Sequence, residues 1–467
     1  MRAGPVLSAL RLILGLALLS AATLSFTGPA GAQTLAQSLT TAYETNPTLL
    51  AARAELRAVN EGVPQAISGW RPNVVLQGSI GGEATHTSFD DELIPSTWTT
   101  QVPREIVLEV RQPIYQGGQV RAAVDSAEAL VQAQRQLLKD TEQTVLLAVV
   151  QAYMDVWRDQ AILGLRINNE ERLRRQREAA LDRFNVGEIT RTDVAQAESR
   201  LAGATADVTA AAGQLETSRA IFRQVVGLEP VSIGQAPPVQ GIPSDKGTTV
   251  ELALQDAPDV VASRFLEDSA LADIRQRLGQ LLPEVSLVGL LLYQEGTTTA
   301  GIDNKSAQIR AEVNVPIYEQ GVTNSQVRQA KQVASQRRLE ITESTRAAEQ
   351  EAVAAWEALI TARAQIKSFQ AQVQAAQIAL EGVVQENTVG ARTVLDILDA
   401  EQEVLDAQVS LVGAQHDEVV ASFRVAAAIG RLTATDLALP VTIYDPQIDY
   451  DKVRNAWFKL SAPGVDE

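Results

Sequence analysis

The chain has 467 residues, 45% of them hydrophobic, a formal net charge of −17 and no cysteine. The acidic balance argues against a nucleic-acid partner, and the lack of cysteine excludes disulfides and a lipid anchor on an N-terminal cysteine. Aromatic residues make up only 4% of the chain, which is typical of long, closely packed helices rather than of a deep aromatic core.

The first 32 residues have the pattern of a secretory signal peptide. Arg2 and Arg11 precede an apolar run over residues 12–19, and Ala30-Gly31-Ala32 provides a small-residue cleavage site. The apolar run is short, which favours a signal peptide over a membrane anchor. We therefore expect residues 1–32 to be removed on export.

Two helices are expected next. The first spans residues 33–44 and ends at Asn46-Pro47, because proline disfavours a helical residue before it. Pro47 can open the second helix, since the first helical turn needs no N–H donor there. This helix continues to about Ser68, with a kink or an early end expected at Pro64.

Two strand pairs are predicted, over residues 73–114 and 284–316. The first contains a polar loop from His86 to Thr100, and the second shows the clearest alternation, with apolar residues at every second position from Ala307 to Val315. Runs of about 10 residues with one apolar face are typical of strands that cross a membrane. An ordinary sheet over a helical core is the alternative, but two matching pairs in an exported chain favour the membrane.

A long segment without proline follows each strand pair, predicting helices over residues 118–185 and 321–388. Each would be about 100 Å long, which requires an elongated molecule. Return helices are expected over 192–227 and 394–430. Their lengths predict that each long helix lies beside two shorter helices stacked end to end.

The remaining segments are irregular. Residues 228–250 are rich in proline and glycine and predict a linker along the surface. The tail, residues 433–467, is polar, with Trp457-Phe458 expected to pack against the body.

The chain is duplicated internally. Val-Gly occurs at 186–187 and again at 389–390, and each glycine is followed six residues later by an aspartate, Asp193 or Asp396. This offset of 203 residues predicts two structural repeats, 33–227 and 251–432. Gly187 and Gly390 are predicted to form tight turns between helices.

No catalytic or cofactor motif is found. His86 and His416 are the only histidines, both predicted to lie at the surface, and there is no phosphate-binding loop, zinc spacing or nucleophile elbow. An enzyme is therefore not expected. A basic run before the first turn is either a solvated helix face or a docking strip for an acidic adaptor: Arg172, Arg174, Arg175 and Arg177.

From Thr34 to Leu432 the chain resembles the TolC family of outer-membrane channel-tunnel proteins. The resemblance is carried by ETNPTLLAARAEL, RFNVGEITRTDVAQAESRLA and VGARTVLDILDAEQEVLDAQ. It implies a mixed α+β, mainly α, fold that forms a homotrimer. Each protomer would give four strands to a 12-stranded transmembrane barrel, and its helices to a periplasmic tunnel of coiled coils.

The resemblance also implies a function. The protein would be the exit duct for type I protein secretion, multidrug efflux or both, in the outer membrane of a Gram-negative bacterium. Its partners would be a periplasmic adaptor (membrane fusion) protein, an inner-membrane ABC or RND transporter and outer-membrane lipid. A periplasmic coiled-coil adaptor or scaffold of a transport complex is the alternative.

The family's gate falls on the two turns. Asp396 and Asp399, three residues apart on one helix face, match the aspartates of the periplasmic constriction, which bind cations. Arg392 matches an arginine that ties neighbouring coils shut. The implied gating latch comprises Arg392, Thr192, Asp193 and Asn387, with Asn387 where the family has a tyrosine.

Overall fold

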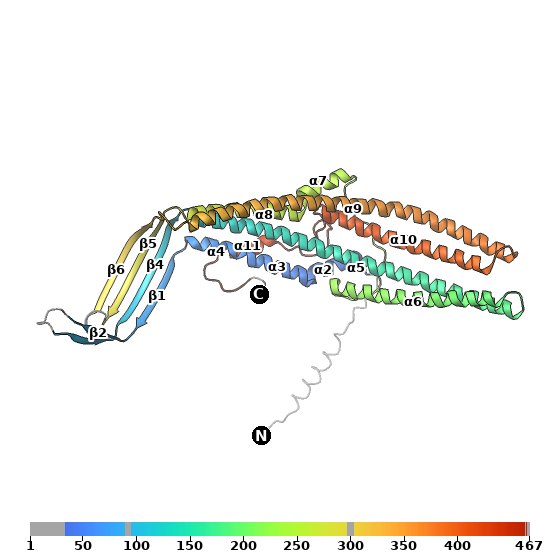
Figure 1. The fold of residues 1–467 in the computed structure, drawn as a ribbon, viewed down its shortest axis with the longest axis horizontal. Helices are drawn as coiled ribbons and strands as arrows, with labels where there is room; N and C mark the ends of the chain where they lie inside the picture. Colours follow the sequence, from blue (N-terminus) through green and yellow to red (C-terminus); the bar gives the residue numbers. More distant parts are fainter. Residues whose placement is uncertain (1–32, 89–94, 297–302, 463, 465–467) are drawn as a thin grey trace, which may run out of the picture.

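The computed structural model of the chain describes residues 33–88, 95–296, 303–462 and 464. The predicted signal peptide, residues 1–32, lies outside the described residues. The fold is mixed α+β and mainly helical, as expected. The molecule is elongated, with a β-sheet at one end and the turns of two helical hairpins at the other (Figure 1).

Four short helical segments come first: α2 (Leu35–Thr45), α3 (Pro47–Asn60), α4 (Gly62–Ile67) and the 3-10 helix η1 (Ser68–Trp70). Asn46 ends α2 and caps α3, because its side-chain oxygen accepts a hydrogen bond from the N–H of Thr48 at 2.9 Å. The sequence predicts a kink or an early end at Pro64. The helix instead breaks three residues earlier, at Glu61, between α3 and α4.

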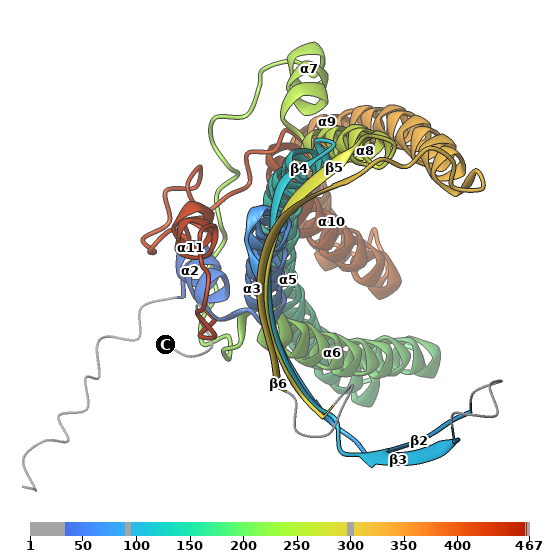
Figure 2. The same ribbon diagram turned by 90° about the vertical axis from the view of Figure 1, so that its left-hand side faces the viewer.

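Four strands form one antiparallel sheet in the order β1 (Asn73–Ile80), β4 (Arg104–Gln116), β5 (Glu284–Glu295) and β6 (Asp303–Asn314). The strand pairs of the two repeats thus meet through β4 and β5, while β1 and β6 are the outer strands. Figure 2 shows the sheet bent into an arc that follows the arrangement of the helices.

One face of the sheet is apolar. Leu76 lies opposite Leu108, which lies opposite Leu291, and residues directly opposite share a face. The next row on this face is also uncharged: Val74, Val110, Gly289 and Ile309.

These apolar side chains are exposed in the single chain, with Leu76 at 71% and Ile309 at 82%. Arg111 and Glu312 lie on the other face, with their charged atoms 2.8 Å apart. A sheet of this kind separates an apolar medium from a polar one.

The polar loop predicted from His86 to Thr100 contains strands, so that prediction was wrong at both ends of the loop. β2 (Glu83–Thr87) and β3 (Thr97–Gln101) pair as a separate two-stranded sheet. Threonines at alternate positions favour extended backbone, because β-branched side chains fit a pleated surface. The rings of His86 and Trp98 add a contact at 4.8 Å between centroids.

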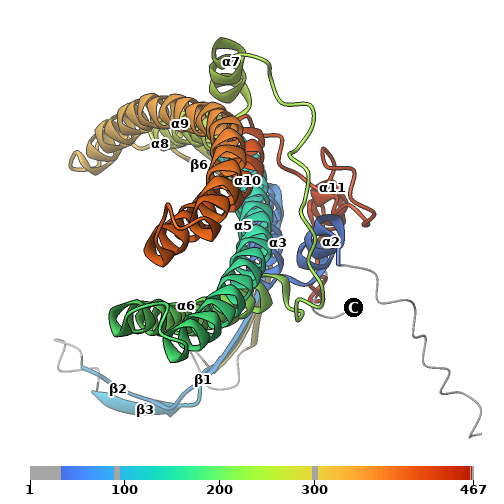
Figure 3. The ribbon, with the colours of Figure 1, turned by 90° about the vertical axis from the view of Figure 1, so that its right-hand side faces the viewer.

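The two long helices are α5 (Gln119–Asn185) and α9 (Val322–Thr388), each of 67 residues. Shorter helices run alongside them: α6 (Arg191–Val226), α8 (Pro258–Gly279) and α10 (Val394–Ala428). Figure 1 shows α8 and α10 in succession along α9, and α3 and α6 in succession along α5. Viewed from the hairpin end in Figure 3, the helices follow one curved wall.

The linker differs from its prediction in two ways. Ile233 and Ala236 are buried in the main core, so this segment does not simply follow the surface. Its end is helical, because Asp245 caps α7 (Lys246–Asp256), which starts inside the predicted 228–250. Apolar residues between its prolines explain the burial.

The tail is less packed than expected. It contains a short helix, α11 (Pro446–Val453). Arg71 lies over the Trp457 ring at 4.7 Å and donates to the carbonyl of Ala456, but Phe458 remains 90% exposed. The expectation that both aromatic residues pack against the body was therefore wrong for Phe458.

The main core surrounds the middle of α5. Leu146 and Met154 of α5 pack with Leu49 of α3, Phe222 of α6 and Phe423 of α10. Within the described ranges, no helix is both long and apolar enough to cross a membrane.

Candidate functional site

The two helical hairpins turn at Gly187 and Gly390. Both glycines are left-handed, with φ of +82° and +77°, a region that L side chains rarely adopt. The turns close with the same hydrogen bonds: the Gly187 N–H donates to Phe184, and the Gly390 N–H donates to Asn387. The duplicated motif thus gives two copies of one backbone structure at the end of the molecule far from the sheet (Figure 1).

Each return helix begins with a capping box. Thr393 caps α10, and the second oxygen of the Asp396 carboxylate (Oδ2) accepts from the Thr393 N–H and hydroxyl, both at 2.8 Å. Thr190 and Asp193 do the same for α6. Sequence reasoning missed this role, although the spacing Thr-x-x-Asp before a helix is its signal.

The cap keeps Asp396 ionised. The hydrogen bonds from Thr393, first from its backbone N–H and then from its hydroxyl, lower the pKa of Asp396 below its ordinary 3.8. Its other oxygen, Oδ1, lies 4.0 Å from Nη1 of Arg392. Asp396 therefore presents a carboxylate beside the turn.

Arg392 is held locally. Its Nε donates to Glu386 at 2.9 Å, and its carbonyl accepts from Nδ2 of Asn387 at 2.8 Å. In the described part of this single chain, the side chain of Arg392 forms ion pairs with Glu386 and Asp396. It forms no ion pair with Asp193 and no hydrogen bond with Thr192 there. The structure thus places Asn387 and Arg392 together and Thr192 and Asp193 together, at separate turns.

Asp399 has a partner that sequence reasoning missed. Nη2 of Arg200, on α6, lies 2.5 Å from Oδ1 of Asp399, on α10. The pair joins the two hairpins. Both side chains are partly exposed, Arg200 at 43% and Asp399 at 56%.

Glu401, next to this pair on α10, is buried. Burial raises its pKa, and the opposite charge of Arg172 on α5 partly counteracts this effect.

Of the basic run, Arg174 and Arg175 pair with Glu170 and Glu171 on α5, and Arg177 pairs with Glu198 on α6. Because these charges are balanced within the chain, the solvated helix face is favoured over a docking strip.

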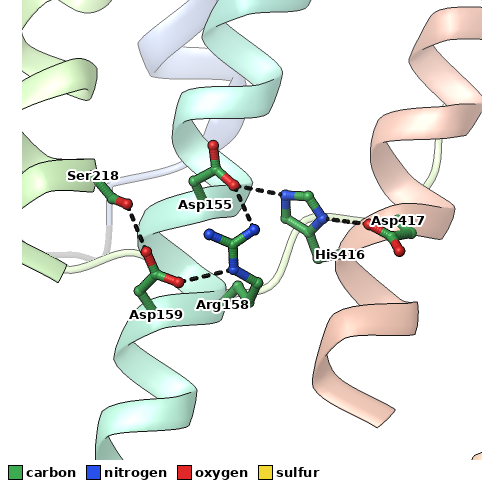
Figure 4. Close-up of polar contacts among 6 residues, drawn as sticks. All are labelled: Asp155, Arg158, Asp159, Ser218, His416 and Asp417. Carbon is green, nitrogen blue, oxygen red and sulfur yellow. Dashed lines mark hydrogen bonds and ion pairs between the residues drawn. The ribbon is translucent and has the colours of Figure 1, made fainter. Parts of the chain in front are cut away.

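A second polar cluster links α5, α6 and α10 (Figure 4). Its centre is His416 of α10, which is only 9% exposed, so the prediction of a surface histidine was wrong. Its Nε2 lies 3.0 Å from Asp155 on α5, and its Nδ1 lies 2.8 Å from Asp417. Val412, Val419 and Val420, one helical turn away along the sequence, were the signal of a buried face.

The cluster continues along α5. Arg158 bridges Asp155 and Asp159 at 2.8 Å each, and the hydroxyl of Ser218 on α6 donates to Asp159 at 2.6 Å. Burial alone would lower the pKa of His416, but the carboxylates of Asp155 and Asp417 outweigh it and raise the pKa above 6.5. The cluster fastens α10 to α5. No set of three metal-ligating side chains occurs among the described residues.

Comparison with known proteins places this geometry in context. The family model described as "Outer membrane efflux protein" matches residues 39–228 and 249–431. The chain is 36% identical over 434 residues to the outer membrane efflux protein BepC of Brucella suis, covering 92% of both chains. It is 26% identical to the outer membrane protein TolC of Vibrio cholerae, covering 90% of this chain and 95% of that one.

A solved structure shares the fold. The outer membrane protein VceC of Vibrio cholerae superimposes with a TM-score of 0.74 at 20% sequence identity. The match covers 85% of this chain and 96% of that chain.

Proposed function

The chain belongs to the outer membrane efflux protein family, and on this premise we propose that three copies form one channel-tunnel gated at its periplasmic end. It is an outer-membrane protein with a large periplasmic portion and a transport function, and it is not an enzyme. The proposed channel is the exit duct for multidrug efflux, type I protein secretion or both.

The one-sided sheet is the observation that carries this proposal. Its apolar face fits the hydrocarbon of a membrane, but four strands are too few to close a barrel. The outer strands β1 and β6 would leave backbone groups unpaired in lipid, where each unpaired group costs several kcal/mol. Three copies around one axis supply 12 strands and pair β6 of one chain with β1 of the next.

The helices then become the tunnel. Each curved wall of about 100 Å helices (Figure 3) would form a third of a cylinder that reaches into the periplasm. The two turns of each chain would surround its far opening. An opening at that end is where a periplasmic adaptor and an inner-membrane ABC or RND transporter would connect, as the family resemblance implies.

The gate is assigned to the second turn. Asp396 and Asp399 of three chains would form a ring of carboxylates at the constriction, favouring cations there. Arg392 would close the opening by reaching Thr192 and Asp193 of a neighbouring chain, with Asn387 holding its backbone. The local pairing of Arg392 with Glu386 is the contact that this neighbour would replace.

Block by cations tests this function. The purified protein in planar bilayers should conduct, and a trivalent cation on the periplasmic side should block it, because a multivalent ion gains most from a ring of like charges. Asp396→Asn with Asp399→Asn should remove the block. Asparagine still accepts the hydrogen bond from Thr393, so the cap is kept.

Thr393→Ala is the matched control, because it weakens the cap but keeps both carboxylates, and block should persist. Persistent block in the double asparagine variant would place the constriction elsewhere. A periplasmic adaptor is the weaker candidate, because membership of an outer-membrane family and the apolar face of the sheet both argue against it.

A further inference from the structure

We propose that Arg200 is a gate-positioning residue that binds Asp399 and thereby holds the two hairpins of one chain together, reducing the free charge of the mouth. The inference rests on the proposed channel function and deepens it. It assigns Asp399 to a latch within the chain, separate from the Arg392 contact between chains.

The geometry of the pair is that of a direct charge-assisted bond. The guanidinium of Arg200 reaches the Asp399 carboxylate at 2.5 Å, across 199 residues of sequence and between two different hairpins. Among the described residues near the turns, the other ion pairs lie within one hairpin. Arg177 pairs with Glu198 inside the first hairpin, and Arg392 pairs with Glu386 inside the second.

An apolar contact between the same helices supports the pair. Leu398, the neighbour of Asp399, is buried against Leu173 of α5 and Ala204 of α6, with Leu201 packed beside them. The ion pair therefore borders the place where α10 touches the first hairpin. This packing fixes the two helices, so that Arg200 loses little freedom in reaching Asp399.

The two repeats differ at this point. With the offset of 203, the counterpart of Arg200 is Glu403, and the counterpart of Asp399 is Gln196. The reciprocal pair therefore has no charges to form it. At this position the first hairpin supplies the cation and the second supplies the anion, so the duplication does not repeat the connection.

The consequence concerns the charge of the ring. Asp396 is kept ionised by its cap, and its ion pair with Arg392 is long, at 4.0 Å, because Arg392 binds Glu386 more closely, at 2.9 Å. Asp399, in contrast, lies 2.5 Å from Arg200. While the latch is closed, Asp396 is therefore the less compensated of the two carboxylates that each chain gives the mouth. Release of Arg200 would restore the second, so that opening the latch would also make the mouth more attractive to cations.

A double-mutant cycle measures this coupling. The half-blocking concentration of hexaamminecobalt(III) is recorded in planar bilayers for the wild type, R200Q, D399N and R200Q/D399N. R200Q should lower it by at least fivefold, because one unit charge gained about 4 Å from even a single positive charge in water gives about that factor, and this ion carries three. Because R200Q removes one positive charge in either background, the conductance without cobalt is recorded as well. R200Q and D399N change the charge of the mouth in opposite directions, but both break the pair, so both should raise the conductance. The double variant has the net charge of the intact pair and should raise the conductance no further than either single variant. Both side chains are partly exposed, so the variants should fold.

R177Q is the matched control, since it breaks an arginine–glutamate pair inside the first hairpin without touching α10. It should leave the conductance unchanged. A conductance that R200Q and D399N leave unchanged, or that they move in opposite directions, would overturn the inference while the wild-type channel still conducts and is blocked. A wild-type protein that forms no channel would overturn the proposed function, and this inference with it.

Discussion

At the scale of single residues, the charged side chains around His416 hold neighbouring helices of the wall together. His416 contacts two carboxylates, Asp155 and Asp417, and Arg158 contacts the same oxygen of Asp155 and an oxygen of Asp159. Removing a charged group from water is costly unless it is paired, and here each buried charge has an opposite one at hydrogen-bond distance. The cluster therefore stabilises the packing of α5 on α10 only while its members keep their charges.

The charge of His416 makes this packing depend on pH. Its folded-state pKa is raised, so its contribution to stability is fully present below pH 6.5 and is lost as the pH rises through the folded-state value. His416→Gln should therefore cost about 2 kcal/mol at pH 6, the value of a hydrogen bond to a charged group, and less at pH 9. Thermal unfolding followed by circular dichroism at the two pH values checks this.

His86→Gln is the control for this measurement, because His86, the other histidine, is exposed on β2. It should change stability little at either pH. An equal loss at pH 6 and pH 9 for His416→Gln would mean that packing, and not charge, is what His416 contributes.

At the scale of elements, the backbone packs closely at the junction between sheet and helices. Gly117 and Gly118 connect β4 to α5 and both have positive φ, +58° and +79°. A Cβ on Gly117 would lie 2.2 Å from the carbonyl oxygen of Gly279, whereas a Cβ on Gly118 would meet nothing within 4 Å. The end of α8 thus packs directly on this turn.

These two glycines allow backbone strain to be separated from packing. Gly118→Ala should cost about 1 kcal/mol, because an L residue in the left-handed region is strained. Gly117→Ala adds a backbone clash and should cost about 3 kcal/mol or more. The yield of folded protein in the outer membrane and its melting temperature compare the variants, and equal losses would contradict the close approach of Gly279.

At the scale of the whole molecule, a single chain is an incomplete wall. Its sheet exposes an apolar face and has two outer strands, and Figure 2 shows the helices continuing the same open arc. An exposed apolar face of this kind is typical of an interaction or membrane surface. In the proposed trimer, identical chains would complete the wall, so that neither half of the duplication needs to close on itself.

The assembly state gives a direct test at this scale. In detergent, the protein should have the mass of three chains, and heating should dissociate it to one, because strand pairing between copies is lost with the fold. Light scattering of the purified protein, before and after heating, measures both. A stable single chain before heating would contradict the trimer and favour the adaptor alternative.

The sequence by itself determined the features that depend on near neighbours. Proline-free stretches predicted helices within a residue or two of α5 and α9, and glycines marked both hairpin turns. Alternation marked the strands of the main sheet, because a strand places every second side chain on one face. The resemblance of the turn motifs then pointed to the family that the comparisons established.

Only the tertiary structure decided which distant residues meet. The partner of Asp399 lies 199 residues away, and the burial of His416 depends on how α10 crosses α5. Polar sequence neighbours suggested a surface position for His416, whereas its helical face met a long helix of the other repeat. The pairing of charges depends on the crossing of helices, and that crossing is set by side-chain packing along their whole length rather than by any local motif.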